Sequence, residues 1–292
     1  MRTYFDCIPC FLRQSLDSVR LITDDERIHE ELMRQVLALA CKMDLRQSPP
    51  AMAQKIHQLI RKLTGVQDPY RRIKDRFNRL ALQMYPELKN RVATSADPLE
   101  TAVRLAIAGN IIDFGVNSDL EESHIEIIIT ESLTAPLDMG VLEDFKQAAA
   151  RAENILYLGD NAGEIVFDRL LIELLGCKRI TLVVKAGPII NDATIEDAID
   201  TGLSDVVKVI DNGSDAPGTI LRSCSESFRR RFNEADLIVA KGQGNYETLN
   251  NVDKEIFFIL RAKCPVIARH LGCEIGSLVL TKNKVRIYKE QK

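Results

Sequence analysis

Ile155-Leu156-Tyr157-Leu158-Gly159-Asp160-Asn161-Ala162-Gly163-Glu164 joins a short apolar run to a polar loop that contains two glycines. The run has the length and composition of a strand that is buried on both of its faces. A helix-length segment, 165–175, follows the loop directly. A strand, a short loop and a helix in this order form the repeating unit of folds with a parallel sheet, so the stretch predicts an α/β fold.

The same alternation continues toward the C-terminus. Apolar runs separated by helix-length segments occur at 180–184, 206–210, 237–240 and 256–260. Near-continuous β-branched and apolar runs are typical of strands in a parallel sheet that helices cover on both faces. We therefore expect residues 93–292 to form a doubly wound α/β domain with a mostly parallel sheet. Residues 125–129 fit either a short strand or a buried helical turn.

The first third of the chain instead contains residues that are typical of helix starts and ends. Thr23-Asp24-Asp25-Glu26 has the pattern of a capping box, and Ser48-Pro49-Pro50 places prolines at the start of another helix. Asp68-Pro69 opens a third helix, which we expect to end at Pro86. Apolar residues at helical spacing follow each of these starts. Residues 1–92 thus predict an all-helical domain that packs directly on the sheet domain.

Composition argues against several classes of function. Of the 292 residues 46% are hydrophobic, which is enough for a full core, and the formal net charge is only −3. So weak an overall charge argues against a nucleic-acid partner or an anionic membrane surface. No apolar stretch is long enough to span a bilayer, and the first residues lack the apolar region of a signal peptide. We therefore expect a cytoplasmic protein without nucleic-acid or membrane partners.

Polar residues follow the predicted strands at the place where open parallel sheets bind ligands, outside the carboxyl ends. Asp160 and Asn161 follow the first run, Asp192 lies a few residues after the second, and Lys241 follows the fourth. Carboxylate and amide oxygens suit Mg²⁺ or Mn²⁺, whereas lysine and neighbouring glycines suit phosphate. Asp-Asn pairs also form turns and helix caps without any ligand. Because separate strand ends each supply residues of types that bind metal or phosphate, the pattern favours a metal and phosphate site.

Motifs for other chemistries are missing from the sequence. It contains no G-x-G-x-x-G, no P-loop and no G-x-S-x-G, which argues against dinucleotide enzymes, NTPases and hydrolases with a serine elbow. Asn161 and Ala162 follow Asp160, so the D-x-D pattern of haloacid dehalogenases is also missing. The pair Cys7-x-x-Cys10 fits half of a zinc site, a redox pair or two packed thiols at a helix start.

Five stretches resemble the metal-dependent damage-control phosphatase family, formerly a domain of unknown function, in its prokaryotic branch with an N-terminal Cys-x-x-Cys. They lie in order over nearly the whole chain, at 7–10, 97–113, 158–164, 185–194 and 241–245. The resemblance implies a helical N-terminal domain on a Rossmann-like α/β domain. It also implies hydrolysis of small phosphate monoesters, such as sugar phosphates or damaged phosphometabolites, with a divalent metal: Mg²⁺, Mn²⁺, Co²⁺ or Ni²⁺.

The resemblance further assigns residues to the site. They are the metal ligands Asp160, Asn161 and Asp192, the active-site lysine Lys241, and a Gly-Asn-x-x-Asp stretch near the same cleft that contains Asn110 and Asp113. In the mechanism that we expect, the metal polarises the phosphoryl group and orients a water, while Lys241 holds the other phosphoryl oxygens. Glu164 acts either as a base or only as an acid that is favourably placed in the first turn of a helix.

Two other functions stay open. An S-adenosylmethionine-dependent methyltransferase would fit a Rossmann-like cleft, although the glycine-rich first loop that this cofactor favours is missing. A non-catalytic protein that binds a phosphorylated metabolite would need similar phosphate-binding residues but would not turn the ligand over.

Overall fold

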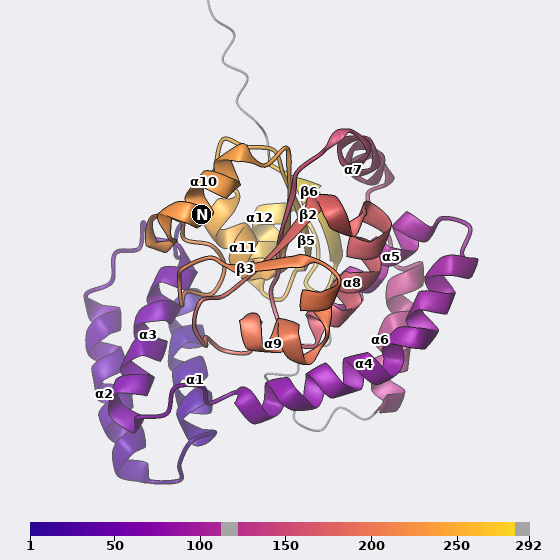
Figure 1. Ribbon diagram of the computed structural model, residues 1–292. Coiled ribbons are helices and arrows are strands. Elements are labelled where there is room, and N and C mark those ends of the chain that lie inside the picture. The colour runs from indigo at the N-terminus through magenta and orange to yellow at the C-terminus, as the bar shows by residue number, and fades with distance from the viewer. Residues whose placement is uncertain (112–121, 284–292) are drawn as a thin grey trace, which may run out of the picture.

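The computed structural model of the protein describes residues 1–111 and 122–283 (Figure 1). Within them, one six-stranded sheet has the strand order β3-β2-β1-β4-β5-β6. The first five strands are parallel, and β6 runs antiparallel to its neighbour β5. The strands are β1 (Ile155–Leu158), β2 (Ile180–Val184), β3 (Lys208–Asp211), β4 (Leu237–Lys241), β5 (Ile256–Arg261) and β6 (Leu278–Lys282).

The central strand β1 is the point at which the strand order reverses. It pairs with β2 on one side and with β4 on the other, so the chain first builds outward in one direction and then in the opposite one. The loops that leave the carboxyl ends of β1 and β4 therefore turn to opposite faces of the sheet. In doubly wound folds this reversal point is where the ligand site lies.

Helices cover both faces of the sheet because the side chains of each strand point alternately to the two sides. Tyr157 of β1 packs with α5, α7 and α8, whereas Leu156 and Leu158 pack with α10, α11 and α12. The predicted doubly wound α/β fold is thus confirmed. The helices from α5 onward are α5 (Pro98–Ile111), α6 (Glu122–Thr134), α7 (Met139–Arg151), α8 (Glu164–Leu175), α9 (Ile195–Asp200), α10 (Glu226–Glu234), α11 (Gly242–Leu249) and α12 (Pro265–Leu271).

The N-terminal part is helical, as the sequence predicts. Its helices are α1 (Cys7–Arg20), α2 (Glu26–Cys41), α3 (Pro49–Thr64) and α4 (Arg71–Thr94). The first three share a small core of their own around Val19, Leu32 and Ile60. Figure 1 shows them gathered at one side of the sheet, with α4 leading from them toward α5 and α6. The boundary that we propose between residues 92 and 93 falls within α4, and this division stays a prediction.

Local structure differs from the sequence-based expectation at three places. Asp25, rather than Thr23 of the predicted capping box, is the N-cap of α2, and its side chain accepts a hydrogen bond from the N–H of Arg27.

The prediction that a helix ends at Pro86 is wrong, because α4 continues to Thr94. A proline removes one helical hydrogen bond, but Leu88 and Val92 beyond it are buried, and their packing stabilises the last turns. Strand β6 was not predicted. Residues 125–129, which fitted a strand or a helical turn, lie in helix α6.

Polar contacts join helix α3 to two loops of the sheet region. Arg61 Nη1 donates to the carbonyl oxygen of Pro188 at 2.9 Å, and Nη2 pairs with Asp215. Gln54 Nε2 donates to the same carboxylate at 2.6 Å. Helix α3 therefore holds the segments that follow β2 and β3. In the described ranges, no helix combines the length and the apolar character needed to cross a membrane.

One buried histidine makes the stability depend on pH. The side chain of His57 in α3 is 3% exposed, and its Nε2 atom has no hydrogen-bond partner. Burial, with a smaller contribution from Arg61, lowers the pKa of His57 from 6.5 to about 4. The unfolded chain therefore binds this proton at a higher pH than the folded protein does. The associated stability is fully present above pH 6.5 and is lost as the pH falls toward 4.

We expect the free energy of unfolding to fall by about 3 kcal/mol across this range because of His57 alone. Urea titrations at several pH values between about 7 and about 4 measure the change. The variant His57→Phe, which cannot bind the proton, should show a flatter dependence over the same interval. An equally steep dependence in the variant would contradict this role of the histidine.

Candidate active site

Backbone hydrogen bonds join the loop after β1 to the loop after β2. Asn161 and Asp192 form an isolated antiparallel bridge, and the N–H of Ala193 donates to the carbonyl oxygen of Asp160 at 2.8 Å. The three residues that the resemblance assigns as metal ligands are therefore brought to one place. This place is the reversal point of the strand order, beside the carboxyl end of β1.

Two amide side chains hold the acidic side chains of this loop. Nδ2 of Asn110, at the end of α5, donates to Asp160 Oδ2 at 2.9 Å and to Glu164 Oε2 at 3.0 Å. Nδ2 of Asn161 donates to the same two oxygens at 3.0 Å and 2.8 Å. All four side chains are buried. Since the amide nitrogen of Asn161 is used in this way, the carbonyl oxygen Oδ1 is the atom with which Asn161 can bind a ligand.

Lys241 lies beneath this layer, with a side chain that is 0% exposed. Its Nζ donates to Glu164 Oε1 at 2.5 Å, to Asp168 Oδ1 at 2.6 Å and to the carbonyl oxygen of Ala106 at 2.8 Å. The hydroxyl group of Tyr157 donates to the same Asp168 oxygen at 2.8 Å. The ammonium group thus has three acceptors, which is the full number that it can use.

Two further lysines lie near the acidic loop. Lys185, at the end of β2, is buried, and its Nζ is 3.5 Å from Asp192 Oδ2. It also donates to the carbonyl oxygen of Gly218 at 2.5 Å. Lys263 follows β5 and is only partly buried, and its charge acts on Asp160. These side chains bring positive charge to the same end of the sheet.

The acidic side chains affect one another strongly because they are buried together. Burial, followed by the negative charges of Glu164 and Asp192, raises the pKa of Asp160 well above its ordinary range. Burial also raises the pKa of Asp168 to about 7, against the opposing effect of Lys241. Although burial alone would lower the pKa of Lys241, its two carboxylate partners raise it. The lysine therefore carries its charge at neutral pH.

The turn between β4 and α11 lies directly against Asp160. Gly242 has a φ of +76°, and a Cβ atom at this position would lie 1.8 Å from Asp160 Oδ2. Only glycine permits both this conformation and this approach. The side chain of Asn245, one turn further along α11, donates to the carbonyl oxygens of Gly159 and Lys241. The end of β4 is therefore locked against the loop after β1.

The residues present fit a hard divalent cation. Asp160, Asn161 and Asp192 together offer carboxylate and amide oxygens, the ligand types that Mg²⁺ and Mn²⁺ prefer, and water commonly completes their coordination. The mutual repulsion that raises the pKa of Asp160 is the kind of charge excess that a cation relieves. The described residues contain no set of three or more His, Cys, Asp or Glu side chains arranged to hold a metal. A site here would need the Asn161 amide and water.

Most of the residues assigned from the sequence come together in the structure. Asn110, Asp160, Asn161 and Glu164 form one hydrogen-bonded group, which Lys241 contacts through Glu164 and Asp192 joins through the backbone. Asp113 lies outside the described residues. The sequence-based assignment did not include Tyr157, Asp168, Lys185 and Lys263. A helical spacing of four residues between Glu164 and Asp168 was the signal that could have identified the latter.

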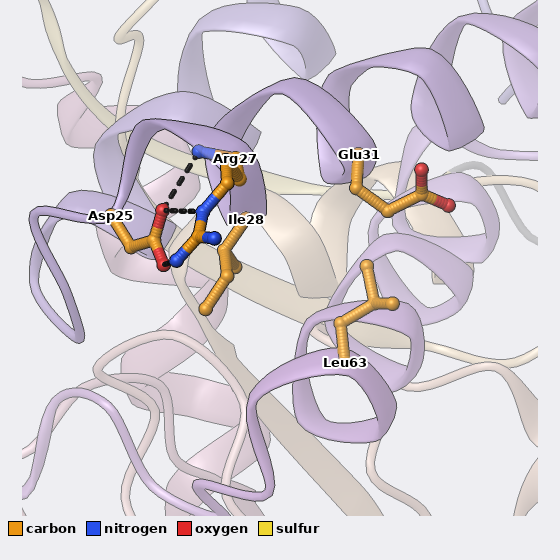
Figure 2. Close-up of a pocket in the computed structure, with 5 residues that line it drawn as sticks. All are labelled: Asp25, Arg27, Ile28, Glu31 and Leu63. Carbon is orange, nitrogen blue, oxygen red and sulfur yellow. Dashed lines mark hydrogen bonds and ion pairs between the residues drawn. The ribbon is translucent and has the colours of Figure 1, made fainter.

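A surface hollow elsewhere on the protein lies between α2 and the end of α3. It is lined by Asp25, Arg27, Ile28, Glu31 and Leu63 (Figure 2). The guanidinium group and the backbone N–H of Arg27 donate three hydrogen bonds to the Asp25 carboxylate, which Figure 2 shows as dashed lines. The hollow shares no residue with the group around Asp160.

Comparison with known proteins gives consistent matches over almost the whole chain. The model of the damage-control phosphatase ARMT1-like domain matches residues 3–279. A damage-control phosphatase of Pyrococcus horikoshii is 37% identical over 295 residues, which cover 98% of this chain and 100% of the relative. One of Archaeoglobus fulgidus is 37% identical over 282 residues, with 94% and 96% coverage. An uncharacterized protein of Methanocaldococcus jannaschii is 40% identical over 291 residues, with 95% and 94% coverage.

A solved structure agrees with these matches. The crystal structure of a DUF89 family protein from Pyrococcus horikoshii superimposes with a TM-score of 0.88 at 35% sequence identity. The similarity covers 97% of this chain and 100% of that one. The family resemblance drawn from the motifs is thereby confirmed. The chain belongs to the damage-control phosphatase ARMT1-like family.

Proposed function

We propose that the protein is a divalent-metal-dependent phosphatase that hydrolyses small phosphate monoesters, either sugar phosphates or damaged phosphometabolites. The observation that carries the proposal is the pairing of the Asp160-Asn161 and Asp192 segments at the reversal point of the sheet. Membership of the family and the names of the two archaeal relatives support phosphatase activity.

Asp160, Asn161 and Asp192 would hold the cation, which is Mg²⁺, Mn²⁺, Co²⁺ or Ni²⁺ in this proposal. When bound, such an ion supplies charge neutralisation at the phosphoryl oxygens and lowers the pKa of a bound water. Because Asn110 donates to Asp160, it orients that carboxylate. Asn161 in turn is oriented by donating to Glu164. These contacts fix the ligand atoms before the substrate arrives, which reduces the cost of reorganisation.

Glu164 and Lys241 act in this proposal as a pair. Glu164 is almost completely buried and accepts hydrogen bonds from Asn110, Asn161 and Lys241. These contacts favour a role in which Glu164 holds the amides in place rather than that of a base. Lys241 keeps Glu164 oriented through its ion pair. The contact of Lys241 with phosphoryl oxygens that the resemblance implies would require its ammonium group to leave these partners, and it stays a prediction.

Lys185 and Lys263 are the cations that we propose for the substrate phosphate. Lys185 lies beside Asp192, and Lys263 lies within electrostatic reach of Asp160. Lysine binds phosphate as a point charge, so neither residue needs the fixed planar geometry of an arginine. Lys185 follows β2 and Lys263 follows β5, so both lie at the carboxyl ends of parallel strands, where Asp160 also lies. Positive charge at this place stabilises phosphoryl oxygens.

Phosphate release from a panel of sugar phosphates tests the function. We expect release with Mg²⁺, Mn²⁺, Co²⁺ or Ni²⁺ and none with a chelator. Asp160→Ala should lower kcat/KM by about a hundredfold or more, since it removes a ligand that stabilises developing charge. Asp205→Ala, an exposed change at the opposite edge of the sheet, serves as the control. Binding of phosphorylated metabolites without release would favour a binding protein, and activity that survives both chelation and Asp160→Ala would contradict the metal site.

The variant Lys241→Met tests the buried ion pair. We expect kcat/KM to fall by at least about tenfold with metal present, because Glu164 and Asp168 would be left buried without a cation. The thermal midpoint of unfolding should fall as well. Lys254→Met removes a lysine that lies just before β5 and donates to the carbonyl oxygen of Asn233, and it should leave kcat/KM unchanged. An unchanged kcat/KM in Lys241→Met would show that activity does not depend on this lysine.

A further inference from the structure

Asn78 lies in α4, in the helical N-terminal part, but its side chain reaches into the sheet region. It is 3% exposed. Its Oδ1 accepts a hydrogen bond from the N–H of Gly163 at 2.7 Å, and its Nδ2 donates to Asp197 Oδ1 at 3.0 Å. Gly163 ends the loop that contains Asp160 and Asn161, and Asp197 lies in the first turn of α9. One amide side chain therefore touches two separate elements of the sheet region.

Asp197 connects this amide to the segment that contains Asp192. Its Oδ2 accepts hydrogen bonds from both the N–H and the hydroxyl group of Thr194, each at 2.8 Å. Thr194 follows Asp192 by two positions and is the N-cap of α9. The charge of Asp197 is balanced by Lys74, one turn before Asn78 on α4, at 2.8 Å. Asn78 thus reaches the second ligand segment through a completely buried, charge-balanced contact.

The loop after β1 is also pressed closely against α4. Gly163 has a φ of +74°, and a Cβ atom at this position would lie 3.0 Å from the Cβ of Phe77 and 3.2 Å from its backbone. No larger residue fits between this loop and the helix without a shift. The N–H of Gly163 therefore points at Asn78 from a fixed distance, and the contact is part of the packing.

We propose that Asn78 is a positioning residue that sets the two metal-ligand segments relative to each other. That these segments carry metal ligands rests on the proposed function, whereas the two hydrogen bonds through which Asn78 links them do not depend on it. The backbone bridge between Asn161 and Asp192 joins the segments at their centre. Asn78 ties them at their far ends, near Gly163 and Thr194. The helical N-terminal part is then a component of the active site, although none of its side chains is a ligand.

Hydrogen exchange of the metal-free protein tests the link. In Asn78→Ala, peptides that cover 159–163 and 191–194 should both exchange faster than in the wild type, because each segment loses its tie. Asn78→Asp keeps an acceptor for Gly163 but replaces the donor to Asp197 with a second carboxylate, which repels Asp197, so 191–194 should exchange faster while 159–163 keeps the wild-type rate. This variant also provides the test if Asn78→Ala does not fold. The control is Thr201→Val, which removes a buried hydrogen bond to the carbonyl oxygen of Asp197 without touching either segment.

Calorimetry with Mn²⁺ alone provides the second measurement. The dissociation constant should rise about tenfold or more in Asn78→Ala, as for other residues that orient metal ligands, and should stay at the wild-type value in Thr201→Val. Unchanged exchange in both segments of Asn78→Ala, or an equal effect of Thr201→Val, would overturn the proposal. If the wild type binds no Mn²⁺ while the exchange pattern is as expected, the proposed metal function fails and the link stands.

Discussion

The ion pairs of Lys241 with Glu164 and Asp168 are the contacts on which the rest of the site depends. A buried ammonium group is tolerated only when acceptors surround it, since the loss of hydration is large. Meeting this requirement brings β4, α8 and the Ala106 carbonyl of α5 together. The other carboxylate oxygen of Glu164 accepts hydrogen bonds from the side-chain amides of Asn110 and Asn161. The same two amides donate to Asp160 and so orient it. The positions of the candidate ligands therefore depend on the buried ammonium group of Lys241.

Much of the fold could be predicted from local pattern. The apolar run before Gly159 and the polar loop after it predicted a buried strand, a turn and a helix, and the structure has β1, the loop and α8. The helix through Pro86 was not predictable in this way, because the packing of Leu88 and Val92 that stabilises it comes from distant residues. Strand β6 was missed for the same reason. Its pairing with β5 is a tertiary contact that a short apolar run does not reveal.

The candidate site, like the fold, could be predicted only in the part that depends on local sequence pattern. Polar residues at strand ends indicated Asp160, Asn161 and Asp192, since the direction of parallel strands predicts that their ends share one edge. The pattern did not reveal that Lys241 points inward, because a lysine after a strand is equally compatible with solvent and with a buried carboxylate. No local sequence pattern identified Asn78 as a residue of the site. Its proposed role depends on where α4 crosses the loop after β1, and that crossing is a property of the assembled helices and sheet.

The antiparallel direction of β6 has a practical consequence. The five parallel strands end at the edge of the sheet where Asp160 and Lys241 lie, whereas β6 ends at the opposite edge, with Lys282 beside Phe257 at the start of β5. The last residues of β6 therefore lie on the far side of the sheet from the candidate active site. Because Lys282 is exposed, a surface linkage introduced at position 282 would leave the end of the sheet that carries Asp160 facing solution.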